Sequence, residues 1–293
     1  MYIELQSILN KKPFKFYYKN FLLSLFKEDK TLNDLTTKYT ATNSKKVEAK
    51  IIAKEKGIVA GLEIIKNVFF IEDKSIKFFS DYKDGMVVKP KDIICTLKGP
   101  TTSILQSERI ALNLLQRLSG VASEASSLVA LLKGTNAHLL DTRKTTPGMR
   151  YLEKYATTVG GSLNHRLNLA DGILIKENHI MVAGSLSKAI KMAYEKKLKN
   201  ILIEVEVKNL EEVKEALTLP ADVIMLDNFS LANTRKAVKI ISGRKKVEAS
   251  GNVNLKTIQA IANTGVDYIS VGAMTHSAHS LDFSLLIYDE FYD

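Results

Sequence analysis

A dense group of charged and hydroxyl side chains follows one short apolar run near the middle of the chain. Residues 137–140 predict a short buried strand. The next ten residues, 141–150, hold three cations, one carboxylate and three threonines. Arg143 can grip a carboxylate or phosphate with two parallel hydrogen bonds, and Lys144 offers a mobile point charge. The pattern predicts an anion-binding site, and the alternative is a polar loop exposed to solvent.

Polar residues also follow each later apolar run. These runs alternate with helical patterns, and they cover residues 172–175, 201–207, 223–226, 246–249 and 268–271. The residues at or after their ends are Lys176, Glu206, Asp227, Ser250-Gly251-Asn252 and Gly272-Ala273. Repeated β-α units imply parallel strands, whose carboxyl ends meet on one face. We therefore expect these side chains to gather around one site.

The order of residue types along this face predicts a particular kind of ligand. Cations come first, the carboxylates of Glu206 and Asp227 follow, and glycine-containing turns come last. Such turns expose backbone N–H groups to phosphate, and paired carboxylates suit a Mg²⁺-chelated polyphosphate. Taken singly, each carboxylate could be a helix cap or ion-pair partner, and each turn only a turn.

The predicted fold class is α/β, with an incomplete or closed α/β barrel and an N-terminal α+β sandwich domain. An open doubly wound sheet is the alternative, although no Gly-x-Gly-x-x-Gly pattern follows the first strand. The helical pattern after Pro100 is expected to break at Gly120, with a second helix beyond it. We predict an N-terminal domain over 1–118, a barrel over 119–275, and a C-terminal segment, 276–293, that packs back on the N-terminal domain.

Composition excludes several classes of function. The chain has 293 residues and a net charge of +10, but its lysines form no basic stripe, so no nucleic-acid partner is expected. The single cysteine, Cys95, excludes an internal disulfide framework and fits a reducing cytoplasm. Neither a leader peptide nor a membrane span is predicted. A catalytic zinc is not expected, and His276 and His279 are interpreted as structural.

The stretch Asp-Thr-Arg-Lys-Thr-Thr-Pro-Gly at 141–148 resembles the signature of the quinolinate phosphoribosyltransferase family. Further segments resemble the same family: 108–113, 115–120, 153–156, 164–166, 174–180, 204–207, 226–228, 250–251 and 270–273. The sequence also departs from the pattern. Ser162 and Asn252 stand where glycine is common in the family, and the loop 28–37 lacks a usual glycine.

The resemblance implies an enzyme that converts quinolinate and 5-phosphoribosyl 1-pyrophosphate to nicotinate mononucleotide, pyrophosphate and CO₂ in NAD biosynthesis. It implies a homodimer in which Arg109 completes the partner's site, and the cytoplasm is the location expected from the cysteine content. The residues expected to hold quinolinate are Arg143, Lys144, His165, Arg166 and Lys176. Glu206 and Asp227 are expected on the Mg²⁺ and ribose side. The 5-phosphate is expected at Ser250, Gly251, Gly272 and Ala273, with Thr142, Asn252 and Val271 as further substrate contacts.

Lys144, Lys176, Glu206 and Asp227 are the expected catalytic residues, the two lysines acting as electrostatic groups. Two alternatives stay open. One is a paralogue of the same fold associated with molybdenum transport, which shares the Asp-Thr-Arg-Lys-Thr element. The other is a non-catalytic anion-binding protein. The run 175–179, which contains Lys176, favours the quinolinate enzyme.

Overall fold

The computed structural model describes residues 12–41 and 45–288, and the chain folds into two compact units. The sheet–helix unit takes the described residues up to 124, together with 151–160 and those from 278 onward. The parallel-sheet unit takes 125–150 and 161–277. In the described part of the chain, no helix is both long and apolar enough to cross a membrane.

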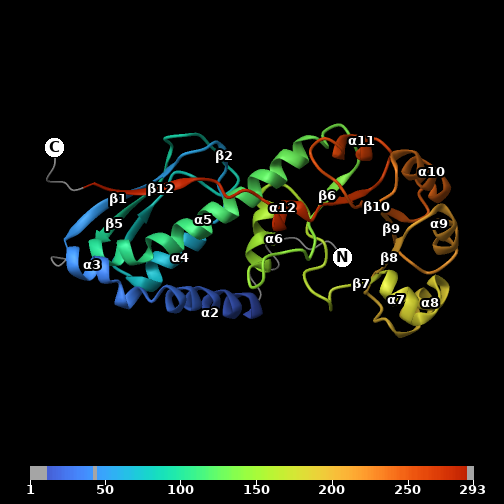
Figure 1. The fold of residues 1–293 in the computed structure, drawn as a ribbon, viewed down its shortest axis with the longest axis horizontal. Helices are drawn as coiled ribbons and strands as arrows, with labels where there is room; N and C mark the ends of the chain where they lie inside the picture. Colours follow the sequence, from blue (N-terminus) through green and yellow to red (C-terminus); the bar gives the residue numbers. More distant parts are fainter. Residues whose placement is uncertain (1–11, 42–44, 289–293) are drawn as a thin grey trace. The chain divides into compact units, whose positions relative to one another are not determined.

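The sheet–helix unit contains a four-stranded sheet whose order is β12-β1-β5-β3. Its strands are β1 (Lys46–Ala53), β3 (Lys77–Phe79), β5 (Ile93–Pro100) and β12 (Phe283–Tyr288), and all pairs are antiparallel. Every second residue of β1 is buried, as the alternation of apolar and polar residues at 47–53 predicts. β12 runs beside β1 from Glu48↔Tyr288 to Ala53↔Phe283 (Figure 1).

Helices and a small two-stranded antiparallel sheet complete this unit. They are α2 (Lys12–Asp29), η1 (Thr31–Asn33), α3 (Leu35–Thr40), β2 (Gly57–Ile58), α4 (Leu62–Glu72), β4 (Val87–Val88), and most of α5 (Thr101–Ala130) and α6 (Arg150–Val159). Residues 125–130 of α5 and Arg150 of α6 belong to the parallel-sheet unit. The loop expected at 28–37 contains η1 and the start of α3, because the Asp34 side chain accepts a hydrogen bond from the backbone N–H of Thr37. α6, expected among the barrel helices, clusters with this unit.

The predicted break at Gly120 is wrong, because α5 continues through it to Ala130. A side chain at this position has no room. A Cβ atom built on Gly120 would lie 1.9 Å from the carbonyl oxygen of His279. Gly120 is therefore needed for the close approach of another backbone segment to the helix surface, and it does not end the helix.

The parallel-sheet unit is an incomplete α/β barrel. Its strands are β6 (His138–Leu140), β7 (Ile173–Ile175), β8 (Ile203–Val207), β9 (Val223–Asp227), β10 (Lys246–Ser250) and β11 (Tyr268–Ser270). All pairs are parallel, in the order β6-β11-β10-β9-β8-β7. No ladder among the described residues joins β6 to β7. Neighbours follow chain order from β7 to β11, and β6 pairs with β11, as in a barrel that is open between β6 and β7. The order lacks the reversal of a doubly wound sheet.

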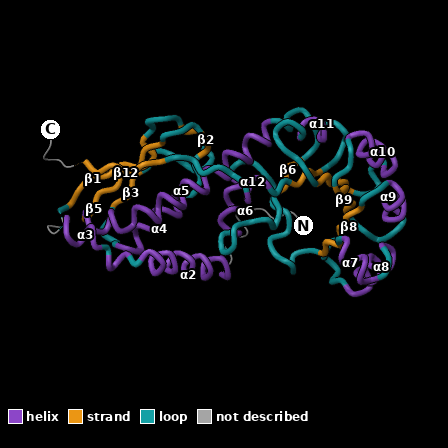
Figure 2. Tube along the Cα trace, viewed as in Figure 1, coloured by secondary structure: helices purple, strands orange, loops and turns teal. Residues whose placement is uncertain are grey.

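Helices cover the outside of this sheet (Figure 2). They are α7 (Glu177–Ala183), α8 (Leu186–Lys196), α9 (Leu210–Leu217), α10 (Leu231–Ile241) and α11 (Ile258–Ala262). The short α12 (Ala273–His276) instead follows the carboxyl end of β11. Ser185, Asn209 and Ser230 each cap a helix by accepting a hydrogen bond from a backbone N–H three residues on. The helices bury apolar side chains against β8, β9 and β10, which fixes the strand ends that form the site.

Candidate active site

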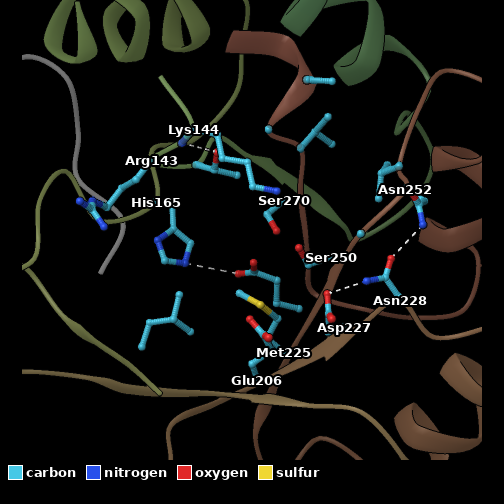
Figure 3. Close-up of a pocket in the computed structure, with 18 of the residues that line it drawn as sticks. Arg143, Lys144, His165, Glu206, Met225, Asp227, Asn228, Ser250, Asn252 and Ser270 are labelled. Carbon is cyan, nitrogen blue, oxygen red and sulfur yellow. Dashed lines mark hydrogen bonds and ion pairs between the residues drawn. The ribbon is translucent and has the colours of Figure 1, made fainter. Parts of the chain in front are cut away.

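One pocket of about 900 Å³ lies at the carboxyl ends of the parallel strands (Figure 3). Every predicted site residue except Arg109 lines it. These residues are Thr142, Arg143, Lys144, His165, Arg166, Lys176, Glu206, Asp227, Ser250, Gly251, Asn252, Val271, Gly272 and Ala273. The structure thus brings together side chains from the ends of six strands and from the segment 165–166.

Arg109 lies on α5, in the sheet–helix unit, and does not line the pocket. Its side chain is 72% exposed, and the Glu108 carboxylate lies 3.9 Å from its guanidinium. An exposed pair at this distance contributes little to stability. The guanidinium is therefore accessible for an interaction outside this chain.

Four cations line the pocket: Arg143, Lys144, Arg166 and Lys176. The Arg166 guanidinium donates to the carbonyl oxygen of Gly172 at 3.1 Å, which fixes its position. Burial, together with the nearby Arg143 cation, lowers the pKa of Arg166. The Lys176 ammonium lies 3.1 Å from the Glu206 carboxylate. This concentration of positive charge in a recess suits a ligand with more than one negative charge.

Asp141, at the end of β6, holds the wall that carries His165 and Arg166. The Asp141 carboxylate is fully buried and accepts hydrogen bonds from the His165 backbone N–H at 2.8 Å and the Asn164 amide at 2.6 Å. A parallel bridge joins Leu140 to Leu163 just before these contacts. The Asp141 carboxylate is therefore a structural group that positions His165, because its oxygens accept hydrogen bonds from the protein itself.

A buried group of three titratable side chains lies beneath the cations. His165 Nε2 lies 2.9 Å from Glu204 Oε2 and 3.8 Å from Glu248 Oε2. The backbone N–H of Arg166 donates to His165 Nδ1 at 2.8 Å, so Nδ1 is an acceptor and the ring proton is on Nε2. Ligand atoms of the three residues lie within 4.8 Å, a spacing that a metal could use. Both ring nitrogens of His165 are, however, already engaged.

Burial raises the pKa of both carboxyl groups in this buried group above the ordinary value. Burial raises the pKa of Glu204 to about 7, although the Arg166 and Lys176 cations oppose the shift. Burial and the neighbouring Glu204 carboxylate raise the pKa of Glu248 well above its ordinary value. A proton shared by Glu204 and Glu248 leaves the pair with one negative charge fewer than two ionised carboxylates would carry.

Carboxylates and tight turns also line the pocket, close to the cations. Glu206 is the penultimate residue of β8, and Asp227 is the last residue of the adjacent strand β9. Gly251 has φ +95°, and a Cβ on Gly272 would lie 2.8 Å from Lys144 Cδ. Glycine at both positions leaves the backbone N–H groups open to close approach by a ligand.

The structure adds lining residues that the sequence prediction missed: Leu174, Met225, Asn228, Glu248, Val253, Asn254, Ser270 and His276. The structural interpretation of His276 is incomplete, because α12 starts directly after Gly272 and brings His276 into the wall. Glu248 could have been noticed as a carboxylate within an apolar run, as Glu204 and Glu206 are. Asn228 directly follows Asp227, so it too had a signal.

The comparisons with known proteins agree with this geometry. The family model described as "Quinolinate phosphoribosyl transferase, C-terminal domain" matches residues 121–286, and the N-terminal domain model of that family matches residues 34–119. The chain belongs to the quinolinate phosphoribosyl transferase family. The pocket lies wholly within the part matched by the C-terminal domain model.

Individual members of the quinolinate phosphoribosyl transferase family are similar over most of their length. A probable nicotinate-nucleotide pyrophosphorylase [carboxylating] of Bacillus subtilis is 42% identical over 267 residues, covering 91% of this chain and 92% of the relative. The crystal structure of NadC from Streptococcus pyogenes is 39% identical with a TM-score of 0.88, covering 94% of this chain and 99% of that one. The nicotinate-nucleotide pyrophosphorylase of Francisella tularensis is 40% identical, with a TM-score of 0.86 and coverage of 92% and 96%.

Proposed function

We propose that this protein transfers the phosphoribosyl group of 5-phosphoribosyl 1-pyrophosphate to quinolinate, forming nicotinate mononucleotide, pyrophosphate and CO₂ for NAD biosynthesis. One observation carries the proposal. Four cations, two carboxylates and two glycine-containing turns surround a single pocket in a chain of the quinolinate phosphoribosyl transferase family. This arrangement matches the charges of the two substrates, one a dicarboxylate and the other a polyphosphate.

Quinolinate would lie against the cations. Its adjacent carboxylates need several positive groups, and Arg143, Arg166 and Lys176 can each donate charge-assisted hydrogen bonds. His165 lines the same subsite, its ring held by Glu204 and by the backbone of Arg166. Two planar guanidinium groups set in buried or half-buried positions favour a planar anion with a defined orientation.

Phosphoribosyl pyrophosphate would lie across the carboxylates and the turns. Asp227 and Glu206 can accept hydrogen bonds from ribose hydroxyls, and Ser250, Gly251 and Gly272 can cup the 5-phosphate. Carboxylate oxygens are also the donors that Mg²⁺ prefers, so Glu206 and Asp227 would hold this ion. Bound Mg²⁺ would supply neutralisation of the pyrophosphate charge.

The reaction requires positioning and fixed charge and needs no protein nucleophile. The bond between ribose C1 and the pyrophosphate oxygen breaks, with its electron pair leaving on pyrophosphate. The pyridine nitrogen then bonds to C1 and becomes positively charged. That charge stabilises the carbanion formed when the adjacent carboxylate leaves as CO₂, and a proton takes its place. Lys144 and Lys176 would stabilise the anionic groups around the reacting centre.

Binding measurements test the proposed quinolinate subsite. We expect calorimetry to show that wild type binds quinolinate more tightly than nicotinate, which has a single carboxylate. Lys176→Ala should weaken quinolinate binding by about tenfold or more, since a charged hydrogen bond is lost. Lys236→Ala, on the exposed face of α10, is the matched control and should bind as wild type does. Equal affinity for both acids in wild type would overturn the proposal.

We further propose that the active form is a homodimer, in which Arg109 of each chain completes the site of the other. The exposure of its guanidinium supports this role. Arg109→Ala and Lys144→Ala should each be nearly inactive alone. Mixing them under subunit exchange should restore roughly a quarter of wild-type activity, because half of the dimers then hold one intact site. Absence of recovery, with exchange verified, would contradict the shared site.

A cytoplasmic location stays a prediction.

A further inference from the structure

Three side chains at the pocket rim form a continuous row of hydrogen bonds. The Asn252 side-chain amide donates to Asn228 Oδ1 at 3.0 Å, and the Asn228 amide donates to Asp227 Oδ1 at 3.0 Å (Figure 3). The row joins the loop after β10 to the end of β9. It therefore links the turn that would cup the 5-phosphate with the carboxylate that would bind the ribose.

The direction of this row is set by Asp227. An ionised carboxylate only accepts hydrogen bonds, so Asn228 must turn its NH₂ group toward Asp227. That orientation leaves Asn228 Oδ1 facing Asn252, which must then donate. Each amide thus has one permitted orientation, and a residue at position 252 that cannot donate would disturb the whole row.

Asn228 is held firmly enough to transmit this orientation. Its backbone N–H donates to the Ser250 carbonyl oxygen at 2.9 Å. Its side chain lies over Gly251, where an added Cβ would be 2.2 Å from Asn228 Oδ1. Asn228 and Asn252 have φ of 55° and 53°, a left-handed conformation that asparagine tolerates better than most residues. The two asparagines are therefore placed by their backbones as well as by their amides.

We propose that Asn252 and Asn228 are positioning residues that fix the Asp227 carboxylate, with Oδ1 engaged by the row and the other oxygen presented to the ribose. This inference rests on the proposed function, because it assigns the ribose to Asp227. When the turn at 250–252 closes around the 5-phosphate, the hydrogen-bonded row aligns the Asp227 carboxylate at the same time. The row makes binding of the phosphate end favour the correct position of the ribose.

Two substitutions at position 252 separate this role from a purely structural one. Asn252→Gly removes the donor and suits the positive φ, so the loop is unstrained. Asn252→Asp keeps the shape and also tolerates positive φ, but its carboxylate cannot donate. The Asn228 amide would then be drawn to the new carboxylate and would turn its oxygen toward Asp227.

The measurements are KM for phosphoribosyl pyrophosphate, KM for quinolinate, kcat, and calorimetric affinity for phosphoribosyl pyrophosphate. Asn252→Gly should weaken phosphoribosyl pyrophosphate binding by about threefold, the loss of one neutral hydrogen bond, and Asn252→Asp by about tenfold or more. KM for quinolinate should stay unchanged in both variants. A structural loop role predicts the reverse order, because aspartate is the closer replacement for asparagine.

Asn233→Asp, on the exposed first turn of α10, adds the same charge away from the pocket and should behave as wild type. Thermal unfolding of all variants should give midpoints close to that of wild type. Equal affinities in wild type and Asn252→Asp would overturn the inference and leave the proposed function intact. Failure of wild type to bind phosphoribosyl pyrophosphate would instead overturn the proposed function.

Discussion

Glu248 is the residue whose burial has the clearest effect on stability. Burial and Glu204 raise the pKa of Glu248 in the folded protein, whereas in the unfolded chain the carboxyl group returns to its ordinary pKa. Between those two values the folded state keeps a proton that the unfolded state releases. Unfolding therefore becomes more favourable as pH rises, by about 1.4 kcal/mol per pH unit for one proton.

Glu248→Gln removes this dependence, because glutamine stays neutral in both states. The free energy of unfolding, measured with urea between pH 5 and pH 8, should fall less steeply with pH in the variant than in wild type. Glu211→Gln, on the exposed surface of α9, is the control and should leave the slope unchanged. Parallel curves for wild type and Glu248→Gln would show that Glu248 does not retain its proton.

Residue identity alone predicted the pocket residues that directly follow strands. Lys176 directly follows β7, Asp227 directly follows the predicted strand 223–226, and the structure brings both into the pocket lining. Glu248 escaped prediction because it lies inside β10, where facing the pocket depends on the register with neighbouring strands. Ser270 escaped because the predicted strand, 268–271, runs past it, whereas β11 ends at Ser270. His276 escaped because a lone histidine carries no signal of its own. The roles of these residues stay predictions until variants are measured.

Among the elements, α5 can approach the backbone at His279 closely because residue 120 is a glycine. Alanine is the better helix former, so Gly120→Ala would stabilise an isolated helix by about 1 kcal/mol. In this fold the added Cβ would meet the His279 carbonyl oxygen at 1.9 Å. We therefore expect Gly120→Ala to lower the free energy of unfolding by about 2–3 kcal/mol, the cost of overpacking.

Chemical denaturation checks this expectation. Ser126→Ala, in the same helix, is the control and should leave stability unchanged or slightly higher. A Gly120→Ala variant as stable as wild type would show that the backbone near His279 can move away from α5. The helix itself was predictable from its apolar stripe, but its passage through Gly120 was not, because the reason lies in a segment far along the chain.

Alternation of apolar runs with helical patterns predicted the β-α repeat, and the side-chain caps at Ser185 and Asn209 show why those helices begin where they do. The pairing of strands was harder to predict from the sequence. β12 joins β1 across more than two hundred residues, and β6 pairs with β11 while no ladder in the described chain joins it to β7. Such long-range choices depend on packing of whole faces, which local patterns do not contain.

For the molecule as a whole, the order of the strands converts a linear sequence into a charge pattern around one pocket. Cations from the first two strands meet carboxylates from the middle strands and turns from the last two. The net charge of +10 adds a long-range attraction for anionic substrates, which salt would weaken. Binding of a dicarboxylate beside a polyphosphate is the property that this arrangement serves.

The most direct test is a steady-state assay of purified protein with Mg²⁺ and phosphoribosyl pyrophosphate, offering either quinolinate or nicotinate and following nicotinate mononucleotide and CO₂. The account predicts product from quinolinate with equal release of CO₂, no comparable product from nicotinate, and loss of at least about a hundredfold in kcat/KM in Lys144→Ala. No product from quinolinate, in a folded protein at any ratio of substrates, would contradict it.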